Sequence, residues 1–336
     1  MDREVGQSLP GINRTLLAIG RRLLQAIPTI IGIALISFLL LNLAPGDLVD
    51  VMAAEQQITD PEVLDRLRES YGLNRSVGQQ LTSYLLDIVR LDLGYSYRDN
   101  QPVLDLILDR LPATLILMLS SLGIAVFLGI VLGVTAALRV NTLTDNLISV
   151  GTVVFFAAPS FWVGLMMMVA FAVQLGWLPV AGMQTIGGDY SLFGAVVDIL
   201  RHLAMPAVAL GLFYAAVYTR VMRASMLEIF GLDFVRTARA KGLSERTVAF
   251  RHVLRNALLP VVTLLSLQLG TVLAGSIVME SVFSWPGIGT LIVEAVAGRN
   301  FPVVVGVLLI SSVLVIAANL IMDLLYRSLD PRVELR

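Results

Sequence analysis

Six stretches of about 20 or more apolar residues constrain this 336-residue chain more than any other feature. A helix of about 20 residues is long enough to cross the hydrocarbon core of a bilayer. The stretches therefore predict an all-α polytopic membrane protein with six transmembrane helices. They run approximately over Leu23–Leu43, Leu111–Leu138, Leu147–Leu175, Leu203–Met222, Ala257–Met279 and Pro302–Leu325.

The composition also favours a bilayer as the solvent. The mean hydropathy is +0.82 and only 15% of residues are charged, whereas about 25% is typical of soluble proteins. A net charge of −1 gives no electrostatic argument for nucleic acid as a partner. The chain has no cysteine, which excludes disulfides and thiolate metal sites. The first apolar stretch lacks a small-residue cleavage site, so we expect it to be retained as a helix.

Basic residues predict the orientation, because they concentrate on the cytoplasmic side of membrane proteins. They are found in the N-terminal segment 1–22, in the loop 223–256 and in the tail 326–336. Both termini are therefore expected in the cytoplasm.

The segment 44–110 lies between the first span and the five-helix core 111–325. It carries twelve acidic residues and six arginines, and we expect it to form a small extracytoplasmic helical cap. A helix opened by Asp60 and Pro61 and closed by Gly72 is its first predicted element.

The loop before the fifth span gathers six of the chain's 24 basic residues into Val235–Asn256. Asp233 is a candidate cap for a short helix that reaches Lys241, and Gly242 suits the left-handed closing position. Ser244 is then a candidate N-cap for a second helix, with Glu245 in its first turn. A partner that grips the short helix would move the fifth span. The alternative is that the arginines only set the topology or contact anionic lipid.

Several classes of function find little support. A P-loop needs Gly-Lys-Ser or Gly-Lys-Thr, and the only lysine, Lys241, lies in Ala-Lys-Gly. We therefore expect no ATPase activity in this chain. His202 and His252 belong to no metal or nucleophile motif, which argues against an intramembrane enzyme. The apolar stretches hold almost no ionisable residues, so an ion-coupled carrier or a channel is disfavoured, although backbone carbonyls can bind sodium.

Five separated sets of residues carry a resemblance to a known family. They are Leu93-Gly94-Tyr95-Ser96 with Arg110-Leu111-Pro112-Ala113-Thr114, Pro159-Ser160-Phe161-Trp162 with Leu175-Gly176-Trp177-Leu178-Pro179, Arg236 to Leu243, Phe283-Ser284-Trp285-Pro286-Gly287-Ile288-Gly289, and Leu329-Asp330-Pro331-Arg332. The sequence resembles the integral-membrane permeases of binding-protein-dependent ABC importers. The branch it most resembles is the B-type subunit of the dipeptide, oligopeptide and nickel importers. Arg236-Thr237-Ala238 departs from the Glu-Ala-Ala of the general EAA loop. The contacts that this loop makes in sugar and amino-acid importers are therefore not transferred to this chain.

The resemblance implies a type I ABC importer permease fold in a bacterial cytoplasmic (inner) membrane. It implies a homologous second permease subunit, two ABC ATPase subunits and an extracytoplasmic substrate-binding protein, besides the lipid bilayer. ATP and Mg would bind to the ATPase subunits, and no cofactor is expected in this chain. Di- or oligopeptides are the favoured substrates. Nickel chelates, glutathione and sugars stay open as alternatives within the same importer class.

Two groups of site residues follow. The coupling helix that would dock on an ATPase comprises Arg236, Thr237, Ala238, Arg239, Ala240, Lys241, Gly242, Leu243 and Glu245. Ala238 and Gly242 are the favoured docking residues, because small side chains allow close approach. Candidates for the translocation path or its gate are Phe161, Trp162, Gln174, Gln268, Ser276 and Glu280. Lipid contact or helix packing is an equal alternative for the aromatic residues. Glu280 could meet a peptide ammonium group or cap the loop around Trp285, a residue expected to act as an interfacial anchor.

Overall fold

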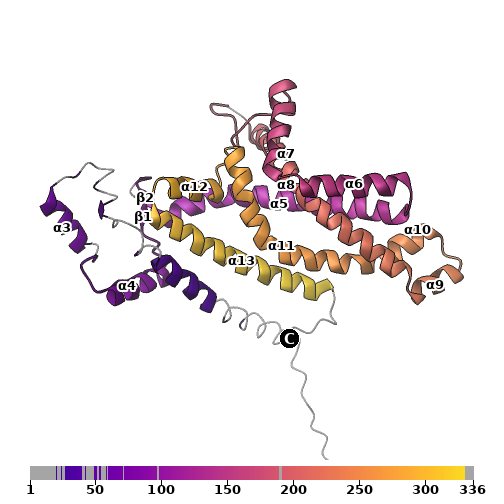
Figure 1. Cartoon of the computed structure of the whole chain (residues 1–336), viewed down its shortest axis with the longest axis horizontal. Helices are drawn as coiled ribbons and strands as arrows, with labels where there is room; N and C mark the ends of the chain where they lie inside the picture. Colours follow the sequence, from indigo (N-terminus) through magenta and orange to yellow (C-terminus); the bar gives the residue numbers. More distant parts are fainter. Residues whose placement is uncertain are drawn as a thin grey trace, which may run out of the picture. The chain divides into compact units, whose positions relative to one another are not determined.

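The computed structural model describes residues 27–39, 60–70, 72–96, 98–188 and 191–329, together with isolated positions between 20 and 58. The predicted N-terminal segment 1–22 lies outside the described residues apart from Gly20, and so does the end of the tail, 330–336. The described part is almost wholly helical (Figure 1), which confirms the predicted all-α class. The chain forms two compact units: Met1–Leu106 with Ala295–Arg336, and Ile107–Glu294.

The elements follow one another along the chain, with π-helical segments labelled η. They are α3 (Pro61–Ser70), α4 (Val77–Val89), β1 (Tyr95–Ser96), β2 (Gln101–Pro102), α5 (Val103–Leu138), α6 (Leu143–Ala157), α7 (Ser160–Met167), η1 (Met168–Gln174), α8 (Leu192–Phe230), α9 (Asp233–Ala240), α10 (Glu245–Thr247), η2 (Val248–Val253), α11 (Leu254–Val282), α12 (Ile288–Ala297) and α13 (Phe301–Leu329). The strands β1 and β2 pair antiparallel, with Tyr95 opposite Pro102.

Four helical stretches of the described residues are long and apolar enough to cross a bilayer: Val103–Leu138, Leu192–Phe230, Glu245–Gln268 and Phe301–Ile321. A fifth candidate span is the pair formed by Leu143–Ala157 and Ser160–Gln174, which is bent by 101°. Pro159 explains the break, because proline forces the preceding residue out of the helical region. Ala158 accordingly has a ψ of 131°. In the region of the first predicted span, the described helix is Ile27–Leu39.

In the first unit, helix Ile27–Leu39, α4 and α13 form a small apolar core around Ala34, Val305 and Leu309. The Tyr84 side chain of α4 packs against this core, and burial raises the pKa of its hydroxyl to about 12. The local signals around α3 act as predicted. The Asp60 carboxylate accepts a hydrogen bond from the Glu62 amide, 3.0 Å away, and Gly72 takes a φ of +65°.

In the second unit, α8 is the central helix and packs against α6, α7 and α11. Its contact with α5 depends on glycine. A Cβ atom at Gly129 of α5 would meet the Tyr218 side chain, and one at Gly133 would lie 2.6 Å from the Met222 Cβ. Small residues let two membrane helices approach until their backbones are close. The sequence Gly129-x-x-x-Gly133 therefore fixes how α5 lies on α8.

Replacing Gly129 with leucine is expected to lower the stability of the protein. The added side chain would overlap Tyr218, and overpacking of this kind costs about 1–3 kcal/mol or more. The measurement is the midpoint of thermal unfolding of the purified protein in detergent. Gly123→Leu is the matched control, because Gly123 is also on α5 but a Cβ atom added there would meet nothing within 4 Å. Equal midpoints for the two variants would contradict the close-packing argument.

Candidate functional site

The basic loop folds as the sequence predicts, with one correction. The short helix α9 spans Asp233–Ala240, and Gly242 follows with a φ of +79°. Ser244 is the N-cap of α10, where its side chain accepts a hydrogen bond from the Thr247 amide. The prediction that Asp233 caps the short helix is wrong, because Leu232 occupies the N-cap position and Asp233 is the first helical residue. Its carboxylate still favours this end of the helix through the helix dipole.

A bidentate ion pair closes the turn between α9 and α10. Arg239 Nε lies 2.8 Å from Glu245 Oε1, and Arg239 Nη2 lies 3.0 Å from Glu245 Oε2. The same guanidinium stands over the Phe230 ring at 5.6 Å from its centroid. Hydrogen bonding to Glu245 raises the pKa of Arg239 above its usual value. Two of the residues predicted to meet a partner therefore bind each other, and they hold the turn in shape.

The two faces of α9 have different surroundings. Val235 and Ala238 are buried in the same core cluster as Val248 and Val253 of η2. Ala238, predicted as a docking residue, thus uses its small side chain to let α9 approach its own chain. The outer face exposes Arg236, Thr237, Ala240, Lys241 and Gly242.

Exposed apolar side chains accompany these polar ones. Phe234 is 42% exposed, Leu243 38% and Phe250 50%. Leu243 belongs to the predicted site, whereas Phe234 and Phe250 were not singled out from the sequence. The signal that would have found them is an aromatic residue in an otherwise charged loop, where its own chain provides little to bury it. Large apolar groups of this kind often mark interaction surfaces when they cluster with polar neighbours.

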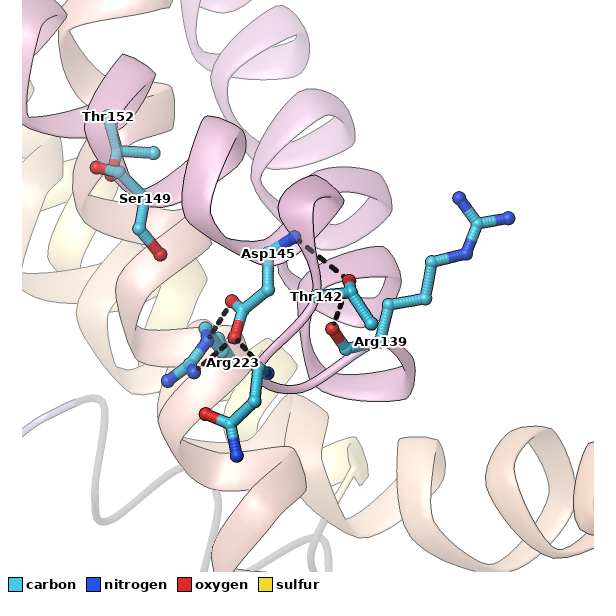
Figure 2. Close-up of polar contacts among 7 residues, drawn as sticks. Arg139, Thr142, Asp145, Ser149, Thr152 and Arg223 are labelled. Atoms are coloured by element: carbon cyan, nitrogen blue, oxygen red, sulfur yellow. Dashed lines mark hydrogen bonds and ion pairs between the residues drawn. The ribbon is translucent and has the colours of Figure 1, made fainter.

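A second polar contact joins the C-terminal part of α8 to the start of α6. Figure 2 shows Arg223 reaching the carboxylate of Asp145. The distances are 2.7 Å from Nε to Oδ1 and 2.8 Å from Nη2 to Oδ2. The Asp145 side chain is only 4% exposed and that of Arg223 is 31% exposed. The backbone amide of Asn141 donates a further hydrogen bond to Asp145, and Thr142 is the N-cap of α6.

This pair, called the α6–α8 clamp from here on, links the basic loop to the membrane helices. α8 ends at Phe230 and leads into α9 after a two-residue turn. A displacement of α9 therefore acts on the last turns of α8, where Arg223 holds Asp145. In the sequence alone, Arg223 is only a topology signal. Its partner is 78 residues away, so no local pattern could reveal the clamp.

The predicted path residues are spread over two helical regions. Phe161 and Trp162 lie at the start of α7, just after the bend, and are 44% and 51% exposed. Trp162 lines an apolar concavity of about 290 Å³ at the bend. Gln174 is exposed at the end of η1, and Gln268 is half-buried on α11. Of these residues, Trp162 lines the concavity at the bend, whereas Phe161 and Gln174 are not among its lining residues.

Ser276 and Glu280 are one turn apart on α11 and are both buried. The Glu280 carboxylate accepts hydrogen bonds from the Thr114 hydroxyl at 2.8 Å, the Gly289 amide at 2.6 Å and the Thr290 amide at 3.2 Å. It therefore caps the first turn of α12 and ties α12 to α5. These contacts correspond to the alternative in which Glu280 caps the loop around Trp285.

Trp285 belongs to the same network and differs from its predicted role. Its side chain is 0% exposed, and the indole Nε1 donates to the Ala113 carbonyl at 2.8 Å. The prediction of an interfacial anchor is therefore wrong. The reason is that the loop after α11 folds back on α5, which a residue-by-residue reading of span ends does not reveal. Thr114 takes part on the other side, where its Oγ1 accepts a hydrogen bond from the Ile288 amide at 2.7 Å.

Glu280→Gln is expected to destabilise the protein by about 1–3 kcal/mol. Only one terminal atom of glutamine accepts hydrogen bonds, so a buried donor among Thr114, Gly289 and Thr290 would lose its partner. The midpoint of thermal unfolding measures this loss, with Glu294→Gln as a control on exposed α12 surface. A variant with unchanged stability and altered selectivity for substrate charge would instead support the predicted outer gate.

Two family models match the chain. The binding-protein-dependent transport system inner membrane component matches residues 129–335. The N-terminal model of the same type of membrane component matches residues 15–118. Together they extend over both units of the structure.

Similar proteins agree with this match. The oligopeptide transport system permease protein AppB of Bacillus subtilis (strain 168) is 40% identical over 319 residues, which cover 94% of this chain and 98% of AppB. The di/tripeptide transport system permease protein DppB of Pseudomonas aeruginosa (strain UCBPP-PA14) is 39% identical over 332 residues, covering 94% and 98%. The dipeptide transport system permease protein DppB of Escherichia coli (strain K12) is 38% identical over 331 residues, covering 94% and 97%.

Solved structures support the fold. Chains from two inward-facing crystal forms of the MetNI methionine ABC transporter align with TM-scores of 0.54 and 0.51. The first is 19% identical and covers 67% of this chain and 96% of that chain. The second is 17% identical and covers 68% and 97%. The predicted fold and the predicted branch are thereby confirmed. The chain belongs to the family of binding-protein-dependent transport system inner membrane components and has the fold of a type I ABC importer permease.

Proposed function

We propose that this chain is the permease subunit of an ATP-driven importer that carries di- or oligopeptides into a bacterial cell. The observation that carries the proposal is the similarity of almost the whole chain, 94%, to permeases of oligopeptide, di/tripeptide and dipeptide transport systems. Identities of 38–40% over this length argue against a different class of transporter.

In this proposal α9 is the coupling helix and lies on the cytoplasmic side, with both termini on that side. The basic residues of the loop support this orientation. The outer face of α9 would fit a groove of an ATPase subunit. Phe234 and Leu243 would supply apolar contact there, and Arg236 and Lys241 would supply charge at the rim.

The closed turn of Arg239 and Glu245 would keep α9 rigid against η2 when the ATPase moves. Motion would then pass into α8 and, through η2, into α11. ATP and Mg would bind only to the two ATPase subunits. A homologous second permease subunit would complete the path, and a binding protein would deliver the peptide from outside.

The experiment is purification of the tagged protein from its native membrane in a mild detergent, with mass spectrometry of the associated proteins. Recovery of a second permease and of P-loop ATPases is expected. Reconstitution of that complex with its binding protein should give ATP-dependent uptake of labelled dipeptides and tripeptides. A lone chain recovered reproducibly across detergents would contradict the importer. A complex that accumulates nickel chelate, glutathione or sugar but no peptide would contradict the substrate class.

A further inference from the structure

Arg220 is a charged residue within a spanning helix. The function proposed above assigns no role to this residue. It lies on α8, two residues before the end of the predicted fourth span. A guanidinium in a membrane helix is costly unless it faces water, the interior of a bundle or an opposite charge. Its surroundings therefore call for an explanation.

The direction of the Arg220 side chain is the first part of that explanation. Its guanidinium carbon lies over the Phe156 ring, 4.5 Å from the centroid. Phe156 is eleven residues along α6 from Asp145, which the clamp holds at Arg223, and that separation is about 16 Å of helix. Arg220 therefore reaches away from the near, basic end of α8.

This direction is opposite to the usual behaviour of an arginine near the end of a predicted span, where α8 itself continues to Phe230. Such a side chain extends toward the nearest aqueous boundary, where its charge is hydrated. Arg220 instead takes its charge toward the bend between α6 and α7, where Phe156 is the next-to-last residue of α6. A cation carried within a spanning helix requires water or an anion beside it.

The described residues provide an aromatic face and no carboxylate for Arg220. No ion pair joins it to a described acidic residue, and Asp145, the acidic residue of α6, is bound by Nε and Nη2 of Arg223. The residue is exposed within the chain. Stacking on Phe156 occupies one face of the guanidinium and leaves its N–H edge available, as bidentate binding of a carboxylate requires.

We propose that Arg220 binds the carboxylate of the peptide during its passage, with Phe156 holding the guanidinium in position. The inference rests on the proposed function, since every unmodified peptide carries a C-terminal carboxylate whatever its side chains are. A site for this shared group would accept peptides of varied sequence. This site would lie where α6 and α8 are in contact, near the bend of the third span.

The test uses the complete complex with its binding protein in proteoliposomes. Arg220→Gln is expected to reduce uptake of a labelled neutral dipeptide about tenfold, in line with the loss of a charge-assisted hydrogen bond. ATP hydrolysis stimulated by the binding protein should stay near the wild-type rate. Arg220→Lys should restore part of the uptake. The matched control is Arg139→Gln, which removes an exposed positive charge in the α5–α6 turn and should leave uptake unchanged.

A photo-crosslinking residue at Val153, exposed one turn before Phe156 on α6, gives a second readout. Peptide capture during turnover that falls in the Arg220→Gln background supports the proposal. Crosslinking only to the second permease subunit overturns it, because Arg220 would then pair with that subunit. The proposal is also overturned if the wild-type complex takes up peptide and the Arg220→Gln complex takes it up at the same rate. A wild-type complex that accumulates no peptide would instead contradict the proposed function itself.

Discussion

Replacing Gly242 with tryptophan is expected to abolish peptide uptake while the protein still inserts into the membrane. Gly242 follows α9 and is exposed, and a Cβ atom added there would meet nothing within 4 Å. The space around this Cβ position is open in its own chain, so the bulk of an indole is expected to interfere with a partner that approaches α9 closely. The positive φ adds backbone strain to any side chain at this position. The measurement is ATP-dependent uptake by the reconstituted complex, with membrane content checked by immunoblot.

Two variants separate bulk from backbone strain. Gly242→Ala keeps the φ of +79°, at a cost of about 1–2 kcal/mol for a left-handed residue, and adds only one methyl group. It should retain most of the uptake. Gly187→Trp has nearly the same φ, +78°, and equally open surroundings, but lies in the loop between η1 and α8. Unimpaired uptake in Gly242→Trp would rule out α9 as the coupling helix.

The features that were predicted correctly from the sequence are those whose signals are local. The break at Gly242 needs a positive φ, and the N-cap at Ser244 needs a hydroxyl three residues before an amide, so both are visible within a few positions. The helix opened by Asp60 is predictable for the same reason. Apolar length in turn predicts the spanning helices, since a bilayer requires about 20 such residues.

The features that were missed depend on contacts between distant residues. The Asp145–Arg223 clamp joins positions 78 residues apart, and the Thr114–Glu280 bond joins positions 166 apart. No spacing rule connects such residues. Trp285 looks like an interfacial anchor because it follows a span, yet it is buried against α5. Its burial depends on a loop path that only the tertiary structure contains.

Arg220 is a different kind of omission, because its signal was present in the sequence. It lies inside the predicted fourth span, where a charged residue is a functional candidate by default. The span ends only two residues later, and a long side chain so near an end is expected to reach the aqueous boundary. Only the contact with Phe156 reveals that it reaches the other way.

Breaking the α6–α8 clamp is expected to uncouple ATP hydrolysis from transport. In Asp145→Asn the amide oxygen can still accept the Asn141 hydrogen bond, and the Thr142 cap of α6 binds only the backbone amide of residue 145. The variant loses the charge that holds Arg223. Removing one partner of a fully buried pair costs about 3–5 kcal/mol, and the partial exposure of Arg223 reduces this to roughly 2 kcal/mol.

The consequence for transport follows from the position of the clamp. If α9 moves with the ATPase but α8 is no longer tied to α6, part of the motion does not reach the bent span. We expect the number of ATP molecules hydrolysed per peptide transported to rise about tenfold, which corresponds to about 1.4 kcal/mol of lost coupling. Both rates are measured on the same proteoliposomes.

A double-mutant cycle distinguishes coupling from general destabilisation. Arg223→Gln should raise the same ratio, and combining it with Asp145→Asn should add little, because the pair is already broken. Arg139→Gln provides a control beside the clamp, because Arg139 is exposed in the α5–α6 turn and does not belong to the docking surface proposed on α9. Additive effects of the two clamp variants would mean that each residue acts separately, and α8 would then transmit motion to α6 through packing alone.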